Sequence, residues 1–218
     1  PHLFPHLFPH LFPHLFPHLF PHLFPHLIPQ AMQLAPEMPL YIEEDYTLNL
    51  RRKLRDGELD MIIIALPFTE ADVVMRPLYD EPFEVLLPKA HPWTKFKTIN
   101  PDQLPGSDLM LLGEGHCFRD QVLQLCPALS KHHNSILKTL AQGSSIETLR
   151  HMVASGLGIT VLPKSATGAS NYTEGLLETR PFKRPAPNRT VAIAWRASFP
   201  RPKAVDLIIQ AAQICRLF

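Results

Sequence analysis

The run Asp60–Leu66, with the sequence Asp-Met-Ile-Ile-Ile-Ala-Leu, decides the fold class of this chain. Its apolar residues follow one another without the alternation of polar residues that a half-exposed strand shows. Continuous runs of this kind are typical of strands buried on both faces, as in the parallel sheets of α/β proteins. A helical pattern over 45–55, which Asp56 and Gly57 end, comes just before it. A helix followed directly by a buried strand predicts an α/β domain.

Outward from this strand, the apolar periodicity predicts helices and strands along the rest of the chain. The expected strands lie at 40–42, 73–78, 84–87, 109–112, 136–140, 159–162 and 191–195. The further expected helices lie at 117–126, 145–154 and 203–217. Strands that alternate with helices favour an α/β fold with mainly parallel sheets.

A second stretch, Gly113–Cys126, contains the residues with distinctive chemistry. Cys117 falls in the first turn of the expected helix, where unpaired backbone N–H groups and the positive end of the helix dipole favour a thiolate. His116 and Arg119 add positive charge beside the sulfur. A free thiol has a pKa near ~8.5, and such surroundings lower it. The alternative, in which both cysteines are small buried hydrophobic residues, is about equally supported.

The spacing of Cys117 and Cys126 adds a second property. In an intact helix the two residues would be roughly 13 to 14 Å apart along the axis and on opposite faces. A disulfide needs Cα atoms within about 7 Å of each other. If the two cysteines pair, the helix must therefore break, which would make this segment a two-state element.

Two runs of residues resemble the LysR-type transcriptional regulators, and in particular their peroxide-sensing members. One is Glu114–Gln121 (Glu-Gly-His-Cys-Phe-Arg-Asp-Gln) together with Cys126, in which residue identities and cysteine spacing agree. The other is Gly143–Pro163, which begins Gly-Ser-Ser-Ile-Glu-Thr-Leu-Arg. The resemblance extends over about residues 25 to 218.

This resemblance implies a topology that the periodicity alone does not. It predicts two Rossmann-like subdomains joined by two crossing segments, as in periplasmic solute-binding proteins. The first subdomain would hold 25–82 plus 188–218, and the second would hold 83–187 with the redox cysteines. The family has a DNA-binding domain ahead of this region, which we do not find, so contact with promoter DNA is expected only through a domain absent from this chain.

The resemblance also implies roles for individual residues. Cys117 would react with hydrogen peroxide, and Cys126 would resolve the product as an intramolecular disulfide. Four residues would form the peroxide pocket: Thr47, His116, Arg119 and Asp120. A thiol–disulfide reductant would reset the sensor. Homodimer or homotetramer assembly also comes from the family resemblance.

Each pocket residue has an ordinary structural alternative. Thr47 sits where a helix cap is normal, and His116 could be a capping or packing residue. Arg119 could be a surface cation, and Asp120 could cap the turn. Ser144 or Ser145 could cap the helix at 145–154 or contact a small anion, as this place often does in the family.

Composition excludes several classes of function. The net charge of +1 over 218 residues does not indicate a polyanion partner. No apolar run reaches the ~18 residues of a membrane span. Three cysteines, an odd count, favour a cytosolic chain with reactive thiols over a secreted disulfide framework. The third, Cys215, lies in an apolar helical pattern and is expected to be a buried structural residue.

Residues 1–24 are copies of Pro-His-Leu-Phe, followed by Pro-His-Leu-Ile at 25–28. A proline inside a helix costs about 3 kcal/mol, so this low-complexity segment is expected to be extended or disordered. Only 23–34 matches the first helix of the family, and the repeat takes the place of the strand that should precede it. The repeated histidines could bind a transition metal adventitiously, but we expect no designed metal site.

The leading hypothesis is therefore a peroxide-responsive regulatory domain with no catalytic residues, no cofactor and no membrane contact. No phosphate-binding glycine loop and no Cys-x-x-Cys motif occur in the sequence. The main alternative is a LysR-type or solute-binding-like domain that senses a small organic ligand without redox chemistry. A thiol peroxidase is a third hypothesis, which the lack of a thioredoxin-like pattern disfavours.

Overall fold

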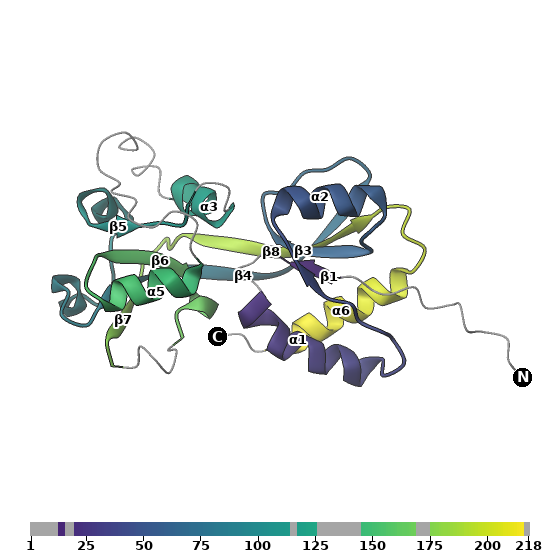
Figure 1. Cartoon of the computed structure of the whole chain (residues 1–218), viewed down its shortest axis with the longest axis horizontal. Coiled ribbons are helices and arrows are strands. Elements are labelled where there is room, and N and C mark those ends of the chain that lie inside the picture. The colour runs from purple at the N-terminus through teal and green to yellow at the C-terminus, as the bar shows by residue number, and fades with distance from the viewer. Residues whose placement is uncertain (1–12, 16–19, 114–116, 126–144, 169–174, 216–218) are drawn as a thin grey trace, which may run out of the picture. The chain divides into compact units, whose positions relative to one another are not determined.

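The computed structural model describes residues 13–15, 20–113, 117–125, 145–168 and 175–215. The chain divides into two compact units, Pro1–Asp80 with Thr190–Phe218 and Glu81–Arg189. Two long strands, β4 (Val73–Pro88) and β8 (Asn188–Arg196), run from one unit into the other (Figure 1). The division at 82 and 188 that we expect from the sequence stays a prediction.

The first unit is built on a mixed sheet in the order β2-β1-β3-β8. Strand β1 (Pro13–Leu15) is parallel to both β2 (Glu43–Glu44) and β3 (Met61–Ala65), whereas β3 and β8 are antiparallel. Every side chain of β3 is buried, which confirms the strand predicted from the apolar run. The predicted α/β class is confirmed, but the sheets are mixed instead of mainly parallel.

Helices cover both faces of this sheet. Helix α2 (Thr47–Asp56) lies on one face, and α1 (Phe20–Leu34) and α6 (Pro202–Ile214) pack against each other on the opposite face (Figure 1). Helix α2 ends where predicted, because Gly57 takes the left-handed φ of 81° that a C-cap residue needs.

The N-terminal repeat contains structure that the sequence analysis did not predict. Strand β1 lies inside the repeat and occupies the place where a first strand was expected to be missing, and α1 begins at Phe20. The period of four brings apolar side chains to one helix face, where Leu23, Phe24 and Leu27 are buried, as is Ala31 just beyond the repeat. The other repeat positions, 1–12 and 16–19, lie outside the described residues.

The energy of that buried face explains why α1 already begins at Phe20, inside the part of the repeat that the proline argument expected to be extended or disordered. Full burial of one Leu or Phe side chain contributes roughly 1.5–3 kcal/mol. Pro25 and Pro29 lie inside α1 but are exposed, so their rings do not disturb the packed face. Several buried side chains offset a proline penalty of about 3 kcal/mol each.

The second unit has its own mixed sheet. Strand β4 is antiparallel to β6 (Ile159–Pro163) and to β7 (Leu177–Pro181), and β6 is parallel to β5 (Leu109–Met110). Its other elements are α3 (Cys117–Leu125), α5 (Ile146–Ala154) and the short 3₁₀ helices η1 (Pro92–Lys95), η2 (Pro101–Gly106) and η3 (Lys164–Ala166). The strand expected at 136–140 lies outside the described residues.

Strand β4 is one continuous strand where the sequence predicted two, at 73–78 and 84–87. The polar residues between them have partners on β8. Thr190 Oγ1 donates to Asp80 Oδ1 at 2.6 Å, and Arg189 Nε donates to Glu81 Oε2 at 2.8 Å. These partners let the strand continue through a polar stretch that the sequence pattern marks as a break.

The core of the second unit lies between its sheet and α3 and α5. Phe83, Leu86, Phe118, Leu149 and Val161 are among its buried residues. In the part of the chain that the structure describes, no helix is both long and apolar enough to span a membrane.

Candidate functional site

Helix α3 begins at Cys117, the residue that the sequence analysis assigns to peroxide. The chain reaches it from β5 through Leu111, Leu112 and Gly113, all of which are buried. A residue at the start of a helix lies beside unpaired N–H groups, which favour a thiolate at this position. His116 and Cys126, the other two residues of the predicted redox segment, lie outside the described residues.

Arg119 is a buried residue of α3, only 7% exposed. Its Nη1 donates to the carbonyl oxygen of Leu112 at 3.4 Å, so the guanidinium reaches back to the segment that leads into the helix. The alternative of a surface cation is therefore wrong for Arg119. Asp120, by contrast, is exposed in the first turn of α3, where its negative charge suits the helix dipole.

Gln121 is a residue that the sequence analysis used only as part of a motif. It is 8% exposed, and its Oε1 is buried without a hydrogen-bond partner among the residues that the structure describes. A buried acceptor without a partner costs about 1–3 kcal/mol. Residues four apart share a helix face, so Gln121 follows Cys117 by one turn on the same side of α3. In the sequence, only this spacing of four residues indicated that Gln121 lies on the same helix face as Cys117.

Phe118 anchors the start of α3 in the core. Its ring is 1% exposed, and its centroid lies 5.8 Å from that of Phe83 on β4. The Cζ atom of Arg189 lies 6.0 Å from the centroid of the same ring, at the outer limit of a cation–π contact. The residue next to Cys117 therefore contacts both long strands.

Beneath Phe118 lies an ion pair that the sequence did not reveal. The side chains of Glu81 and Arg189 are 0% and 3% exposed, with Arg189 Nη2 2.7 Å from Glu81 Oε2. The second carboxylate oxygen, Oε1, accepts a hydrogen bond of 2.9 Å from the backbone N–H of Ser165. The buried carboxylate thus has partners on both oxygens, as a buried charge requires.

Helix α5 contributes a second buried arginine, which holds the segment that binds Glu81. Arg150 is 2% exposed and donates from Nη1 to Gly168 O at 2.6 Å and from Nη2 to Ala166 O. These bonds fix η3, which carries the Ser165 N–H bound to Glu81. Ser145 accepts from Thr148 N at 3.3 Å and so caps α5, which is the ordinary alternative for that residue.

Thr47, the remaining predicted pocket residue, lies in the first unit. It is the first residue of α2, and the N-cap is Tyr46, so Thr47 is not the helix cap that the ordinary alternative requires. Its Oγ1 is buried and has no hydrogen-bond partner within the described residues. A hydroxyl normally donates and accepts, so a buried one without a partner is unusual.

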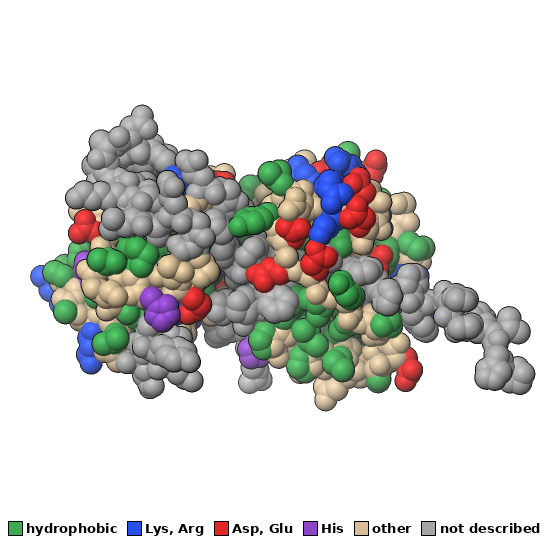
Figure 2. Space-filling model, in the orientation of Figure 1, with side chains coloured by type: hydrophobic (Ala, Val, Ile, Leu, Met, Phe, Trp, Pro, Cys, Tyr) green, Lys and Arg blue, Asp and Glu red, His purple; other side chains and the backbone are tan. Residues whose placement is uncertain are grey.

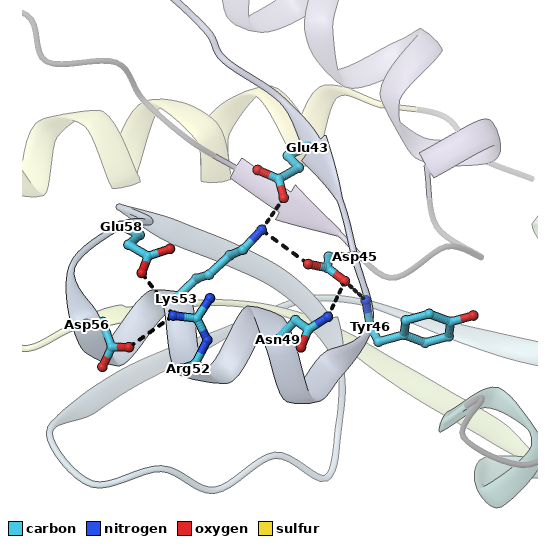
Figure 3. Close-up of polar contacts among 8 residues, drawn as sticks. All are labelled: Glu43, Asp45, Tyr46, Asn49, Arg52, Lys53, Asp56 and Glu58. Atoms are coloured by element: carbon cyan, nitrogen blue, oxygen red, sulfur yellow. Dashed lines mark hydrogen bonds and ion pairs between the residues drawn. The ribbon is translucent and has the colours of Figure 1, made fainter.

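The turn before Thr47 is held by a network of side chains (Figure 3). Asp45 Oδ1 accepts from Tyr46 N and from Asn49 Nδ2, both at 2.7 Å, and Asp45 Oδ2 lies 3.1 Å from Lys53 Nζ. Burial by itself would raise the pKa of Asp45, but the bonds from Asn49, Tyr46 and Lys53 outweigh it and lower the pKa. The hydrogen bond to Glu43 is the main reason that the pKa of Lys53 is raised.

Cys215, the third cysteine, lies at the C-cap of α6 and is half-buried, not fully buried as expected. Its Sγ donates to Ala211 O at 3.2 Å. Burial raises the pKa of this thiol, which makes it less reactive than a free cysteine. Within the described residues, no group of three or more His, Cys, Asp or Glu side chains is placed to bind a metal ion.

Comparison with known proteins identifies relatives of the whole region. The family model for the LysR substrate binding domain matches residues 14–214. The DNA-binding transcriptional dual regulator OxyR of Escherichia coli K12 is 33% identical over 179 residues, which are 82% of this chain and 57% of that protein. The chain thus spans about half the length of the curated relatives that it matches.

Solved structures give the same result. The reduced form of the OxyR regulatory domain from Pseudomonas aeruginosa has 55% identity and a TM-score of 0.86, and the match covers 94% of this chain and 98% of that one. A cysteine mutant of Corynebacterium glutamicum OxyR, solved with hydrogen peroxide bound, has 29% identity and a TM-score of 0.86. That match covers 95% of this chain and 64% of the other.

Proposed function

Because this chain belongs to the family of LysR substrate-binding domains, we propose that it is the hydrogen-peroxide-sensing regulatory domain of a transcriptional regulator. The names of its relatives and the likeness to OxyR regulatory domains support this function. The observation that carries it furthest is the position of Cys117 as the first residue of α3, because that is where a helix activates a thiol.

The chemistry proceeds in two balanced steps. The Cys117 thiolate attacks one oxygen of hydrogen peroxide, the O–O bond breaks, and the products are a sulfenic acid and, after protonation of the leaving hydroxide, water. The Cys126 thiol then attacks the sulfenic sulfur, which forms the disulfide and releases a second water. One peroxide is reduced and two thiols are oxidised. A cellular thiol–disulfide reductant then reduces the disulfide and returns both cysteines to thiols.

Formation of the disulfide requires α3 to unwind. In an intact α3 the Cα atoms of Cys117 and Leu125, the last helical residue, are roughly 12 Å apart, and the Cα atom of Cys126 can lie no more than ~3.8 Å from that of Leu125. A disulfide tolerates about 7 Å at most. Unwinding would take Phe118 out of contact with Phe83 and remove the ring from the Glu81–Arg189 pair. Oxidation of Cys117 would thereby change the contacts that α3 makes with both β4 and β8.

The proposed peroxide pocket keeps the four predicted residues and gains one. Arg119 supplies a buried positive charge at the start of α3, and Thr47 has a buried hydroxyl without a hydrogen-bond partner in the described residues. Asp120 and His116 are retained from the family resemblance. Gln121 is added, since its buried acceptor and its position one turn after Cys117 suit a hydrogen bond to peroxide or to the sulfenic acid.

The proposed partners follow from the same assignment. Promoter DNA would be bound by a separate DNA-binding domain, and the regulatory domain would assemble as a homodimer or homotetramer whose packing changes on oxidation. The family is one of transcriptional regulators. We propose that this domain is oxidised once and then reduced once for each signal, and that it does not act as an enzyme. We also propose a cytoplasmic location, where a regulator that binds DNA would operate.

Mass mapping after sub-stoichiometric peroxide tests the function directly. We expect a Cys117–Cys126 linkage in the unsubstituted chain, a trappable sulfenic acid at Cys117 in Cys126→Ser, and no linkage in Cys117→Ser. Cys215→Ser is the matched control and should behave like the unsubstituted chain, because burial raises the pKa of that thiol. Oxidation that spares Cys117, or that links it to Cys215, would contradict the proposal.

A cavity in the first unit favours a second candidate, the sensing of a small organic ligand without redox chemistry. The cavity has a volume of about 640 Å³, within the range of small-molecule sites, and is lined by residues 35–39, 200–204 and 207. Calorimetry against candidate metabolites would test it, with Cys117 and Cys126 both replaced by serine. Binding that survives the replacement would support this second candidate.

A further inference from the structure

We propose that Lys53 is a positioning residue for the peroxide reaction, because it holds Asp45 and thereby the backbone that carries Thr47. The inference rests on the proposed function and extends it to a residue that would not touch peroxide itself. All of its geometry lies within the first unit, around the start of α2 (Figure 3).

The start of α2 lacks the usual means of fixing a helix end. The N-cap residue, Tyr46, makes no side-chain capping hydrogen bond, and the first turn contains no acidic residue. The first N–H groups of a helix have no partners within it, and an uncapped end frays. Thr47, as the first residue of α2, would share that fraying unless something outside the helix holds it.

Asp45 supplies that restraint from both sides of Thr47. Its Oδ1 accepts from the backbone N–H of Tyr46, which directly precedes Thr47, and from the side-chain amide of Asn49, two residues after it. Both distances are 2.7 Å, which is short for an N–H···O bond and consistent with an ionised acceptor. Burial would raise the pKa of Asp45, but the hydrogen bonds from Asn49, Tyr46 and Lys53 lower it, as expected where these donors stabilise the charged carboxylate.

Lys53 in turn holds Asp45. Its ammonium group lies 3.1 Å from Asp45 Oδ2 and also contacts Glu43 Oε1 on β2. The side chains of Lys53 and Asp45 are each 18% exposed, so the pair is less screened by water than a surface ion pair. The ammonium therefore ties the sheet to the turn, and the turn to the first residues of the helix.

The position of the Thr47 hydroxyl follows from that backbone. Threonine is stiff at χ1, so once the backbone is fixed the direction of Oγ1 is nearly fixed as well. A hydrogen bond to a reacting oxygen works over a narrow range of distances, and a misplacement of ~1 Å can slow a reaction by about 10²-fold. We expect removal of the Lys53 contact to displace the hydroxyl by less than ~1 Å, and therefore to slow the reaction by less than this factor.

Arg52 provides a matched control on the same helix. It carries the same charge, adjoins Lys53 in the sequence, and pairs with Asp56 and Glu58 at 3.3 and 2.9 Å instead of Asp45. Figure 2 shows acidic and basic side chains gathered over α2, and Figure 3 labels Arg52, Asp56 and Glu58 beside Lys53. A substitution at Arg52 therefore changes the charge of the cluster equally while it leaves the turn before Thr47 intact.

The experiment measures how fast Cys117 reacts with two reagents, in the full chain with Cys126→Ser and Cys215→Ser so that Cys117 is the remaining cysteine. Hydrogen peroxide needs a positioned hydrogen bond, whereas alkylation by iodoacetamide reports thiolate reactivity alone. We expect Lys53→Met to slow peroxide oxidation by roughly three- to tenfold and leave the rate and pH profile of alkylation unchanged. Lys53→Arg should recover most of the loss, and Arg52→Met should cause none.

A double-mutant cycle with Thr47→Val separates positioning from a purely structural role. Thr47→Val should slow peroxide oxidation by about tenfold or more, and Lys53→Met should add nothing in that background, since the hydroxyl that it positions is gone. Losses that multiply, a Lys53→Met rate equal to that of the parent, or equal losses with both reagents would each overturn the inference. If the unsubstituted chain does not oxidise at Cys117, the proposed function itself fails.

Discussion

Arg189 and Glu81 form a buried ion pair at the point where the two long strands lie beside each other in the second unit. Arg189 Nε donates to Glu81 Oε2 at 2.8 Å, and Nη2 lies 2.7 Å from the same oxygen. Because Phe118 of α3 packs over this guanidinium, the pair links the helix that begins with Cys117 to β4 and β8.

Removal of the carboxylate should destabilise the protein strongly. In Glu81→Ala the buried Arg189 loses its counter-charge, and loss of one partner of such a pair costs about 3–5 kcal/mol. Urea unfolding would measure the change. The exposed pair Arg76–Asp206, at 3.5 Å, offers the control, and Asp206→Ala should change the free energy of unfolding by less than about 1 kcal/mol. Equal effects of the two substitutions would contradict the role of the buried pair.

Phe118→Ala should make α3 easier to unwind. The ring is fully buried against Phe83, and such truncations cost about 3–5 kcal/mol. Since disulfide formation requires an unwound α3, we expect a larger share of oxidised Cys117 to proceed to the Cys117–Cys126 disulfide before dimedone can trap the sulfenic acid. Gln124→Ala, at an exposed position of the same helix, should leave that share unchanged. A higher yield of trapped sulfenic acid in Phe118→Ala would contradict this view.

Gln121→Leu should separate stability from function. Leucine removes a buried acceptor that has no partner in the described residues, so we expect a free energy of unfolding that is unchanged or higher by about 1 kcal/mol. The same substitution removes a polar group beside Cys117, and we expect slower oxidation by peroxide. Stopped-flow kinetics and thermal unfolding measure the two effects. A stable Gln121→Leu with the parent rate would exclude Gln121 from the pocket.

The decrease in the free energy of unfolding at acidic pH should depend in part on Asp45. Its folded-state pKa is lowered from an ordinary value of 3.8, so the folded state binds this proton more weakly than the unfolded state does. The stability that Asp45 contributes is therefore fully present above the unfolded pKa and is lost as pH falls through the folded pKa. Asp45→Asn should flatten this part of the curve in urea titrations at acidic pH. An unchanged slope would contradict the assignment.

Local patterns in the sequence were enough to predict elements whose stability is local. The apolar run before Leu66, the capped helix at 146–154 and the Gly57 stop all obey rules that involve only neighbouring residues. The prediction was wrong for the helical residues 20–24 of the repeat, because its prolines were judged by local cost alone. The burial of Leu23 and Phe24 against other parts of the first unit outweighs that cost, and no local rule contains it.

The candidate site divides in the same way. The motif around Cys117 and the helix that begins there were readable from the sequence, because a helix start and nearby charges are properties of one segment. The burial of Arg119 and the unpartnered oxygen of Gln121 were not readable, because exposure depends on what the rest of the chain places against α3.

The sequence by itself determined the α/β class, the redox motif and most helix and strand positions, since each depends on the spacing of residues along the chain. Only the tertiary structure decided that Glu81 and Arg189, 108 residues apart, share a buried ion pair beneath Phe118, and that Lys53 holds the turn before Thr47. Contacts of this kind arise when folding brings distant segments into a low-dielectric interior, where a charge must have a partner.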